Sequence, residues 1–289
     1  MNSISAHNIK IIECPRDAMQ GWPHFIPTDK KIEYINNLLK AGFDTIDFGS
    51  FVSPTAIPQM ADTKDVINSL ELGNTNTKLL AIIANLRGAT DAVEFDKITY
   101  LGFPFSISET FQQRNTNSSV DESLKRVEDI QNLCIQHNKE LVVYISMGFG
   151  NPYADEYNEE IVIKRIKHIE ELGVKIISIA DTVGLATANN VSDLLEKILP
   201  IFKNIEMGVH LHSAPENRID KLKAAVNAGC RRFDSALKGI GGCPMAGNNL
   251  VGNMDTETML RYFEERGEQL QIDNIALQKC NKMASEIFI

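Results

Sequence analysis

The 289-residue sequence contains no apolar run of about 18 residues, which excludes an ordinary membrane-spanning helix. Its first ten residues have neither the apolar core of a secretory signal nor an arginine-rich amphipathic pattern, so we expect no targeting peptide and a cytoplasmic protein. Basic residues are fewer than acidic ones, 29 against 38, and the formal charge is −9. We therefore expect no nucleic-acid partner, because phosphate affinity requires a basic surface. A small anionic ligand is not excluded, since a few local charges can hold it.

Cysteine is sparse and irregularly spaced. No CxxC pair is present, so neither a zinc knuckle nor a thioredoxin-type pair is indicated. An odd number of cysteines without a secretory signal favours a reducing compartment and free thiols. The five are Cys14, Cys134, Cys230, Cys243 and Cys280. We treat only Cys243 as a candidate for chemistry and expect the others to be inert.

No low-complexity tract or Pro/Ser-rich linker divides the chain. Instead, short runs rich in Ile and Val alternate with segments of helical periodicity, a pattern typical of parallel strands buried on both faces. The predicted strands are residues 9–13, 44–49, 78–84, 97–102, 141–147, 175–180, 206–212 and 231–236. The predicted helices include residues 29–40, with Thr28 as N-cap, 122–137, 159–172, 192–202 and 216–228.

Three junctions repeat the order helix, glycine, strand. Gly42, Gly173 and Gly229 follow helical segments, where a left-handed residue past the helix end favours glycine. Eight strands in 289 residues leave about 36 residues per unit, close to the spacing of a (β/α)8 barrel. We predict one α/β TIM-barrel domain over residues 1–289, with the barrel at about 9–266 and a short C-terminal helical segment at about 267–289. An open doubly wound sheet is the alternative, although no GxGxxG follows the first strand.

The chemistry of such a barrel lies at the carboxyl ends of its strands, and His210-Leu211-His212 is the most specific signal there. Strand residues two apart point to the same side, so both imidazoles can face one divalent metal, with a carboxylate such as Asp17 completing the set. No cysteine accompanies them, which favours Mg²⁺ or Mn²⁺ over a closed structural zinc site. The alternative is two histidines that only donate hydrogen bonds at the barrel mouth.

Two other features stay open on the residues alone. Arg16 and Asp17 are either a simple ion pair that closes a loop or part of the site. Cys243 lies in the glycine-rich segment GIGGCPMAGNNLVGN, so its thiol is either inert filler or a group that a mobile loop brings to a ligand.

Several stretches together resemble the 3-hydroxy-3-methylglutaryl-CoA lyase family, and they occur in family order along nearly the whole chain. They are PRDAMQ (15–20), SFVSPTAIPQM (50–60), ANLRG (84–88), GNPY (150–153), ADTVG (180–184), VHLH (209–212), GGCP (241–244) and GN (252–253). PRD, HxH and DTVG are shared with related Claisen-type synthases. GGCP and SFVSPxxxPQM are more specific to the lyase.

The resemblance implies a homodimeric TIM barrel that uses Mg²⁺ or Mn²⁺ to cleave 3-hydroxy-3-methylglutaryl-CoA into acetoacetate and acetyl-CoA. The metal ligands it implies are Asp17, His210, His212 and Asn253. The catalytic residues it implies are Cys243, Arg16, His210 and Asp181, and the substrate-binding residues are Arg16, Gln20, Asp47, Ser50, Asn85 and Thr182. Among the departures from the family, Asp47 stands where glutamate is more usual, and CPRDAMQ replaces GPRDGLQ.

The implied reaction is a retro-Claisen cleavage in which a tertiary hydroxyl loses its proton and the enolate of acetyl-CoA leaves. Arg16 would stabilise the enolate oxygen, and Cys243 would protonate the enolate carbon. The base that accepts the hydroxyl proton stays open among Asp17, His210, Asp47 and Asp181.

Other functions share parts of this pattern. A Claisen-condensing synthase of the isopropylmalate or homocitrate type has the same barrel and metal set, but it usually carries further C-terminal regions and lacks the GGCP loop. A pyruvate-type metal aldolase is a more distant alternative. A non-catalytic CoA-metabolite-binding barrel would need neither the metal set nor Cys243.

Overall fold

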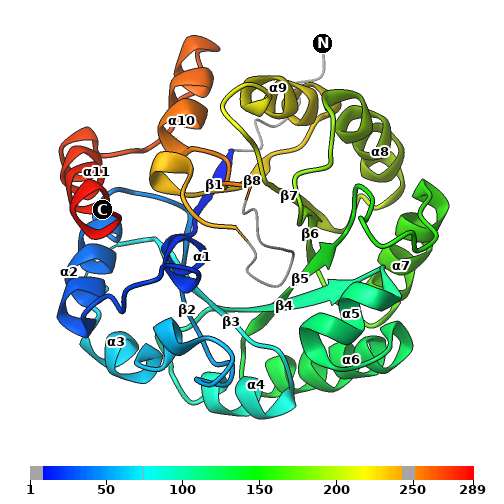
Figure 1. The fold of residues 1–289 in the computed structure, drawn as a ribbon, viewed down its shortest axis with the longest axis horizontal. Helices are drawn as coiled ribbons and strands as arrows, with labels where there is room; N and C mark the ends of the chain where they lie inside the picture. Colours follow the sequence, from blue (N-terminus) through cyan, green and yellow to red (C-terminus); the bar gives the residue numbers. More distant parts are fainter. Residues whose placement is uncertain (1–8, 74, 243–250) are drawn as a thin grey trace.

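The computed structural model describes residues 9–73, 75–242 and 251–289. Within them, parallel strands pair in chain order and close into a barrel, β1-β2-β3-β4-β5-β6-β7-β8, with β8 beside β1 (Figure 1). The prediction of a TIM barrel is confirmed. The strands are β1 (Lys10–Glu13), β2 (Thr45–Ser50), β3 (Lys78–Ile82), β4 (Tyr100–Ser106), β5 (Glu140–Ser146), β6 (Ile176–Asp181), β7 (Glu206–Leu211) and β8 (Arg232–Ser235).

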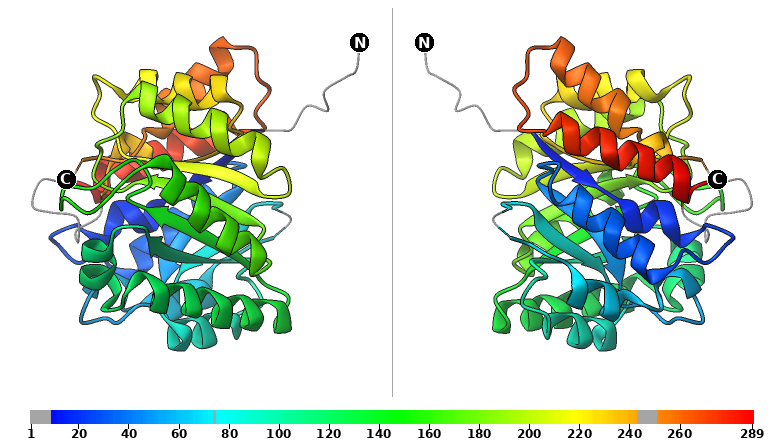
Figure 2. Two further views of the ribbon diagram at one scale, coloured as in Figure 1. Left: turned by 90° about the vertical axis from the view of Figure 1, so that its right-hand side faces the viewer. Right: turned by 90° about the vertical axis from the view of Figure 1, so that its left-hand side faces the viewer.

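Helices cover the outer face of the barrel on all sides (Figures 1 and 2). They are α1 (Pro15–Gln20), α2 (Thr28–Leu38), α3 (Thr63–Ser69), α4 (Leu86–Val93), α5 (Glu109–Thr116), α6 (Val120–Gln136), α7 (Glu159–Glu171), α8 (Ala188–Ile201), α9 (Arg218–Ala228), α10 (Thr256–Glu265) and α11 (Asn274–Ile287), with 3-10 turns η1 (Pro58–Met60) and η2 (Leu237–Gly239). Among the residues described, no helix has both the length and the apolar character needed to cross a bilayer.

Apolar side chains pack on both sides of the sheet, as the runs of Ile and Val predict. The main core lies between barrel and helices, and a smaller cluster of Leu80, Tyr100, Val142, Tyr144 and Ile176 forms a separate core. Gly42, Gly173 and Gly229 have φ values of 87°, 87° and 106°, so the predicted left-handed glycines are confirmed.

Two local predictions are wrong. The fourth strand runs over Tyr100–Ser106 rather than 97–102, although Gly102 and Pro104 look like strand breakers. Beyond Gly102 the strand pairs with β5 alone, so a residue without an N–H at 104 interrupts no ladder with β3. Thr28 is the first residue of α2 rather than its cap, because its hydroxyl donates to Asp62 at 2.8 Å and the N-cap is Pro27.

The predicted C-terminal helical segment is confirmed by α11, which lies alongside α2 (Figure 2). Phe288, just past the end of α11, packs edge-on against Trp22 and Tyr34, with ring centroids 5.3 and 6.5 Å apart. Trp22 follows α1 at the carboxyl end of β1, so the end of the chain supports a loop beside the barrel mouth.

Candidate active site

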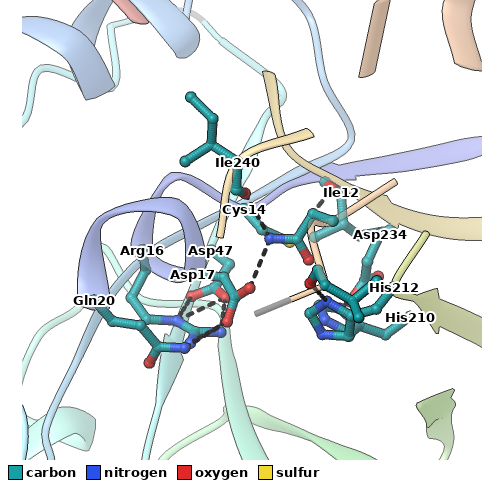
Figure 3. A network of polar contacts seen from close by, with 12 residues as sticks. Ile12, Cys14, Arg16, Asp17, Gln20, Asp47, His210, His212, Asp234 and Ile240 are labelled. Carbon is teal, nitrogen blue, oxygen red and sulfur yellow. Dashed lines mark hydrogen bonds and ion pairs between the residues drawn. The ribbon is translucent and has the colours of Figure 1, made fainter. Parts of the chain in front are cut away.

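A cavity of about 820 Å³ opens at the carboxyl ends of the barrel strands. Its lining includes seven of the residues selected from the sequence, namely Arg16, Asp17, Gln20, Asn85, Thr182, His210 and His212. Figure 3 shows the polar residues at its base, where Arg16, Asp17 and Gln20 approach the two histidines from α1.

A single residue, Cys14, separates β1 from α1, which begins with Pro15 at its first position, where no intrahelical N–H bond is lost. Arg16 is buried and donates from Nε and Nη2 to the Asp47 carboxylate, at 3.0 and 2.5 Å from Oδ2. Its Nη1 donates to Asp17 Oδ1 at 2.9 Å. The planar guanidinium is therefore held by two carboxylates, a geometry that an ammonium cannot reproduce.

Asp47 lies in β2 next to a bulge, where the register with β3 shifts between Asp47 and Gly49. Burial raises the pKa of its carboxyl to about 6, and the adjacent Arg16 opposes that rise. Asp17 responds differently: burial favours its neutral form, but Arg16 and the two histidines hold its pKa well below the usual range. Asp17 is thus an anion near neutral pH.

Asp17 accepts three hydrogen bonds from side chains. Besides Arg16, Gln20 Nε2 donates to Oδ1 at 2.6 Å, one turn along α1, and Asn253 Nδ2 donates to Oδ2 at 2.7 Å. Asn253 is brought there by a backbone bridge to His212, and its Nδ2 also donates to the Ile240 carbonyl at 2.8 Å. Because its amide protons are used in this way, Asn253 Oδ1 is the atom that could serve a cation.

His210 and His212 lie at the end of β7, with ring centroids 5.0 Å apart. The Nδ1 atom of His210 lies 3.0 Å from Asp234 Oδ2, and that of His212 lies 2.9 Å from the Val251 carbonyl. Both partners are acceptors, so each ring carries its proton on Nδ1 and keeps the Nε2 lone pair for a metal.

The electrostatics of the two rings differ. Burial lowers the pKa of His210, but the hydrogen bond and charge of Asp234 outweigh it, and the net direction is upward. For His212, burial and the neighbouring His210 lower the pKa. The carboxylate beside His210 thus makes that ring the more basic of the two.

The donor set fits a divalent cation. One ligand atom each from Asp17, His210 and His212 lie within 4.8 Å of one another, as binding to a common ion requires. Two imidazoles with one carboxylate leave coordination positions open for an oxygen ligand, which suits Mn²⁺ or Mg²⁺ with a chelating substrate.

The structure places other sequence candidates away from the cavity. Asp181 lies next to Thr182, which lines the cavity, but its own side chain accepts from Lys221 Nζ at 2.8 Å and from the Ala186 amide at 3.0 Å. Ser50 is buried, and its hydroxyl accepts from the Val52 amide at 3.3 Å.

Asn85 and Thr182 line the cavity with side chains that also hold the backbone. Asn85 caps α4 by accepting from Gly88, and Thr182 accepts from the Met147 amide at 2.9 Å. Cys243 lies outside the described residues.

Sequence reasoning did not select three residues of the candidate site. Asp234 orients His210, Lys221 holds Asp181, and Trp22 lines the cavity. Asp234 could have been found, because it is an acidic residue within the predicted strand 231–236, and a charge buried in a barrel strand requires a partner. Cys14 also has its thiol within 4.8 Å of ligand atoms of His210 and Asp234, so the residue that replaces the family glycine lies against the site.

Gly241 shows how closely the chain passes this site. Its φ is 115°, and a Cβ there would lie 2.4 Å from Asn253 Nδ2 and 2.9 Å from the Asp17 carbonyl. A side chain at 241 would therefore displace residues that surround the proposed cation position.

Known proteins are similar to this chain in sequence and in fold. A hydroxymethylglutaryl-CoA lyase of Bacillus subtilis is 32% identical over 273 residues, 94% of this chain and 89% of that protein. A 3-hydroxy-3-isohexenylglutaryl-CoA/hydroxymethylglutaryl-CoA lyase of Pseudomonas aeruginosa is 30% identical over 253 residues, 87% and 83% of the two chains. A solved HMG-CoA lyase from Acinetobacter baumannii, in complex with coenzyme A and 3-methylmalate, matches with a TM-score of 0.90 and 32% identity, covering 100% of this chain and 93% of that one.

The family model described as HMGL-like matches residues 8–284. The motifs that resemble the lyases are thus part of a similarity that extends over nearly the whole chain. The chain belongs to the HMGL-like family of enzymes.

Proposed function

We propose that this enzyme cleaves 3-hydroxy-3-methylglutaryl-CoA into acetoacetate and acetyl-CoA with the help of a divalent cation. The observation that carries the proposal is the convergence of Asp17, His210 and His212 beside Arg16 at the base of one cavity. The relatives that match at 30–32% identity carry lyase names, and one was solved with coenzyme A, which supports an acyl-CoA substrate.

A cation held by Asp17, His210 and His212, with Asn253 nearby, would supply Lewis acidity that makes the substrate hydroxyl easier to deprotonate. Arg16 would hold the thioester oxygen on which enolate charge develops. Its orientation is set before substrate arrives, because Asp47 and Asp17 already bind three of its nitrogens.

The positions of the four candidate bases narrow the choice of the group that accepts the hydroxyl proton. Of the four candidates, Asp17 and His210 line the cavity. Asp47 is occupied by Arg16, and Asp181 is held by Lys221 on the side facing α9. His210 carries its proton on Nδ1 and offers its Nε2 lone pair to the cation, so we place the proton-accepting step with Asp17.

The direct test is formation of acetoacetate from the CoA thioester, measured by a coupled assay with and without Mn²⁺. Metal-dependent acetoacetate is the expected result. Its absence would reject the lyase, and release of free CoA from acetyl-CoA with a 2-oxo acid would indicate a condensing synthase instead. The 3-hydroxy-3-isohexenylglutaryl thioester belongs in the same assay, because the cavity wall near Trp22, Phe25 and Ile57 is apolar.

The catalytic acid is tested by a further variant, Cys243→Ser. We expect it to fold and to bind Mn²⁺ normally while kcat falls on the order of 10²- to 10⁴-fold, because a hydroxyl is a much weaker acid than a thiol. Turnover near the wild-type value would remove the thiol from the mechanism. We also propose that the chain forms a homodimer, as the resemblance implies. Sedimentation of the purified chain tests this proposal.

A further inference from the structure

Lys221 is a buried lysine on a barrel helix, and its ammonium group lies beside the proposed metal centre. It belongs to α9, and its side chain is only 1% exposed. Nζ donates to Asp181 Oδ2 at 2.8 Å, to the His212 carbonyl at 2.8 Å and to the Gly184 carbonyl at 3.4 Å. One ammonium group therefore joins α9 to the ends of β6 and β7.

Each hydrogen-bonding atom of the Lys221 and Asp181 side chains has a partner. An ammonium carries three protons, and three acceptors surround this one. The other oxygen of Asp181 accepts from the Ala186 amide at 3.0 Å, so the carboxylate is fixed at both oxygens. Ala180 and Thr182 line the cavity, and adjacent strand residues point to opposite sides, so Asp181 faces α9 rather than the substrate.

His212 is held at two points as a result. Lys221 binds its backbone carbonyl, and Val251 accepts the proton on its ring Nδ1. The next residue, Ser213, donates its amide to the Gly252 carbonyl at 2.8 Å, which ties the same stretch to the Asn253 segment. With the carbonyl and Nδ1 both fixed, Nε2 has little freedom to move away from Asp17.

We propose that Lys221 is a positioning residue for the metal ligand His212, and that Asp181 acts through Lys221 rather than on the substrate. This inference rests on the proposed metal site. It assigns Asp181 a role different from the catalytic one that the sequence suggests.

The chain offers a matched control in Lys31. Its side chain is 2% exposed, it pairs with Asp62 at 2.8 Å, and it also donates to a backbone carbonyl, that of Gln59. No histidine or ligand of the proposed metal site is among its partners in the described residues. Lys31→Met thus removes the same kind of buried charge pair without touching His212.

The experiment measures Mn²⁺ affinity by EPR titration of the full chain and melting temperature by calorimetry. Lys221→Met and Lys31→Met should each lower the melting temperature by about 10 °C, because each leaves an aspartate buried without its cation. Only Lys221→Met should weaken Mn²⁺ binding, by about 10- to 100-fold. Equal Mn²⁺ affinity in the two variants would overturn the proposal.

A double variant, Lys221→Met with Asp181→Asn, distinguishes the positioning of His212 from the balance of buried charge. It also replaces the single variant in the experiment if the single variant does not fold. It removes both charges, so the melting temperature should recover by more than half. The Mn²⁺ affinity should stay reduced, because the His212 carbonyl still lacks its donor. Recovery of wild-type Mn²⁺ affinity in the double variant would contradict a positioning role.

These outcomes are independent of the lyase assay. If acetoacetate is not formed but Lys221→Met alone weakens Mn²⁺ binding, the proposed reaction fails and the positioning role stands. If the wild-type chain binds no Mn²⁺, the positioning role is overturned together with the metal site.

Discussion

Two walls of the cavity are stabilised in different ways. Charged side chains stabilise the wall that carries the candidate metal ligands, and the side-chain amide of Gln59 supports the loop that carries Trp22. On the metal side, Asp17 in α1 and Asp234 in β8 orient their partners through ionic hydrogen bonds. On the other side, Gln59 Nε2 donates to the carbonyls of Trp22 and His24 at 3.0 and 2.5 Å, while its Oε1 accepts from the Ile26 amide at 3.1 Å.

The difference shows which parts of the site are free to vary. Strand ends in a closed barrel are fixed by neighbours on both sides, so they can hold charges at defined separations. A loop fixed by one side chain and by an aromatic contact with Phe288 can change shape without disturbing the metal ligands. We therefore expect the chemistry to depend on the metal side and substrate affinity to depend on the Trp22 side.

In the comparison of the two walls, the larger effect is expected on the metal side. Arg16→Lys should lower kcat on the order of 10²- to 10³-fold, because the three protons of an ammonium would all be used by Asp47 and Asp17, which leaves none for the substrate oxygen. Steady-state kinetics at saturating Mn²⁺ would measure it. A kcat within twofold of the wild type would show that the guanidinium does not meet the developing charge.

Loss of Asp234 should weaken metal binding rather than substrate binding. In Asp234→Ala, His210 loses the acceptor that fixes its tautomer, so the Kd for Mn²⁺ should rise by about 10- to 100-fold. The control is Asp273→Ala, which removes an aspartate that caps α11 and lowers stability without contacting a histidine. Unchanged Mn²⁺ binding in Asp234→Ala would mean that the hydrogen bond does not orient the ring.

The loop side is tested by Gln59→Leu, which keeps the volume and removes three hydrogen bonds. The KM for the acyl-CoA should rise on the order of tenfold, because the backbone beside Trp22 loses its support. The Kd for Mn²⁺ should not change. If the variant weakened Mn²⁺ binding instead, the two walls would not be independent.

The smallest effect on activity is expected at Glu13, a second carboxyl near the end of β1. Asp17 accepts from the Arg16 guanidinium, whereas the buried Glu13 accepts from neutral donors, Thr256 Oγ1 at 2.6 Å and the Leu237 amide at 2.9 Å. Burial raises the pKa of Glu13 to about 8. The folded state then binds more protons than the unfolded state between about pH 4.5 and 8, so stability falls as pH rises through that window.

Glu13→Gln should remove this pH dependence. The free energy of unfolding of the wild type should fall by about 3 kcal/mol more than that of the variant between pH 5 and pH 8. Urea unfolding at the two pH values measures the difference. Parallel curves for the two proteins would show that Glu13 is already ionised at pH 5.

The sequence predicted the architecture because its signals are local. Alternation of apolar runs with helical periodicity, and glycine at positions 42, 173 and 229, depend on neighbours along the chain. The pair His210 and His212 was predictable for the same reason, since a spacing of two on a strand determines a shared direction. Where pairing decided the outcome, as at Pro104 in β4, the prediction was wrong.

Side-chain direction separates what the sequence determined from what the tertiary structure decided. The sequence alone identified the barrel, the paired histidines and Asp17. Only the folded barrel turned Asp181 toward α9, brought Asp234 to His210 and placed the Lys221 ammonium against the His212 carbonyl. The physical reason is that the register of a strand with both neighbouring strands decides which of its side chains point into the barrel and which point toward the helices. A helix side chain such as Lys221 finds its partners only when nonadjacent segments have closed around it.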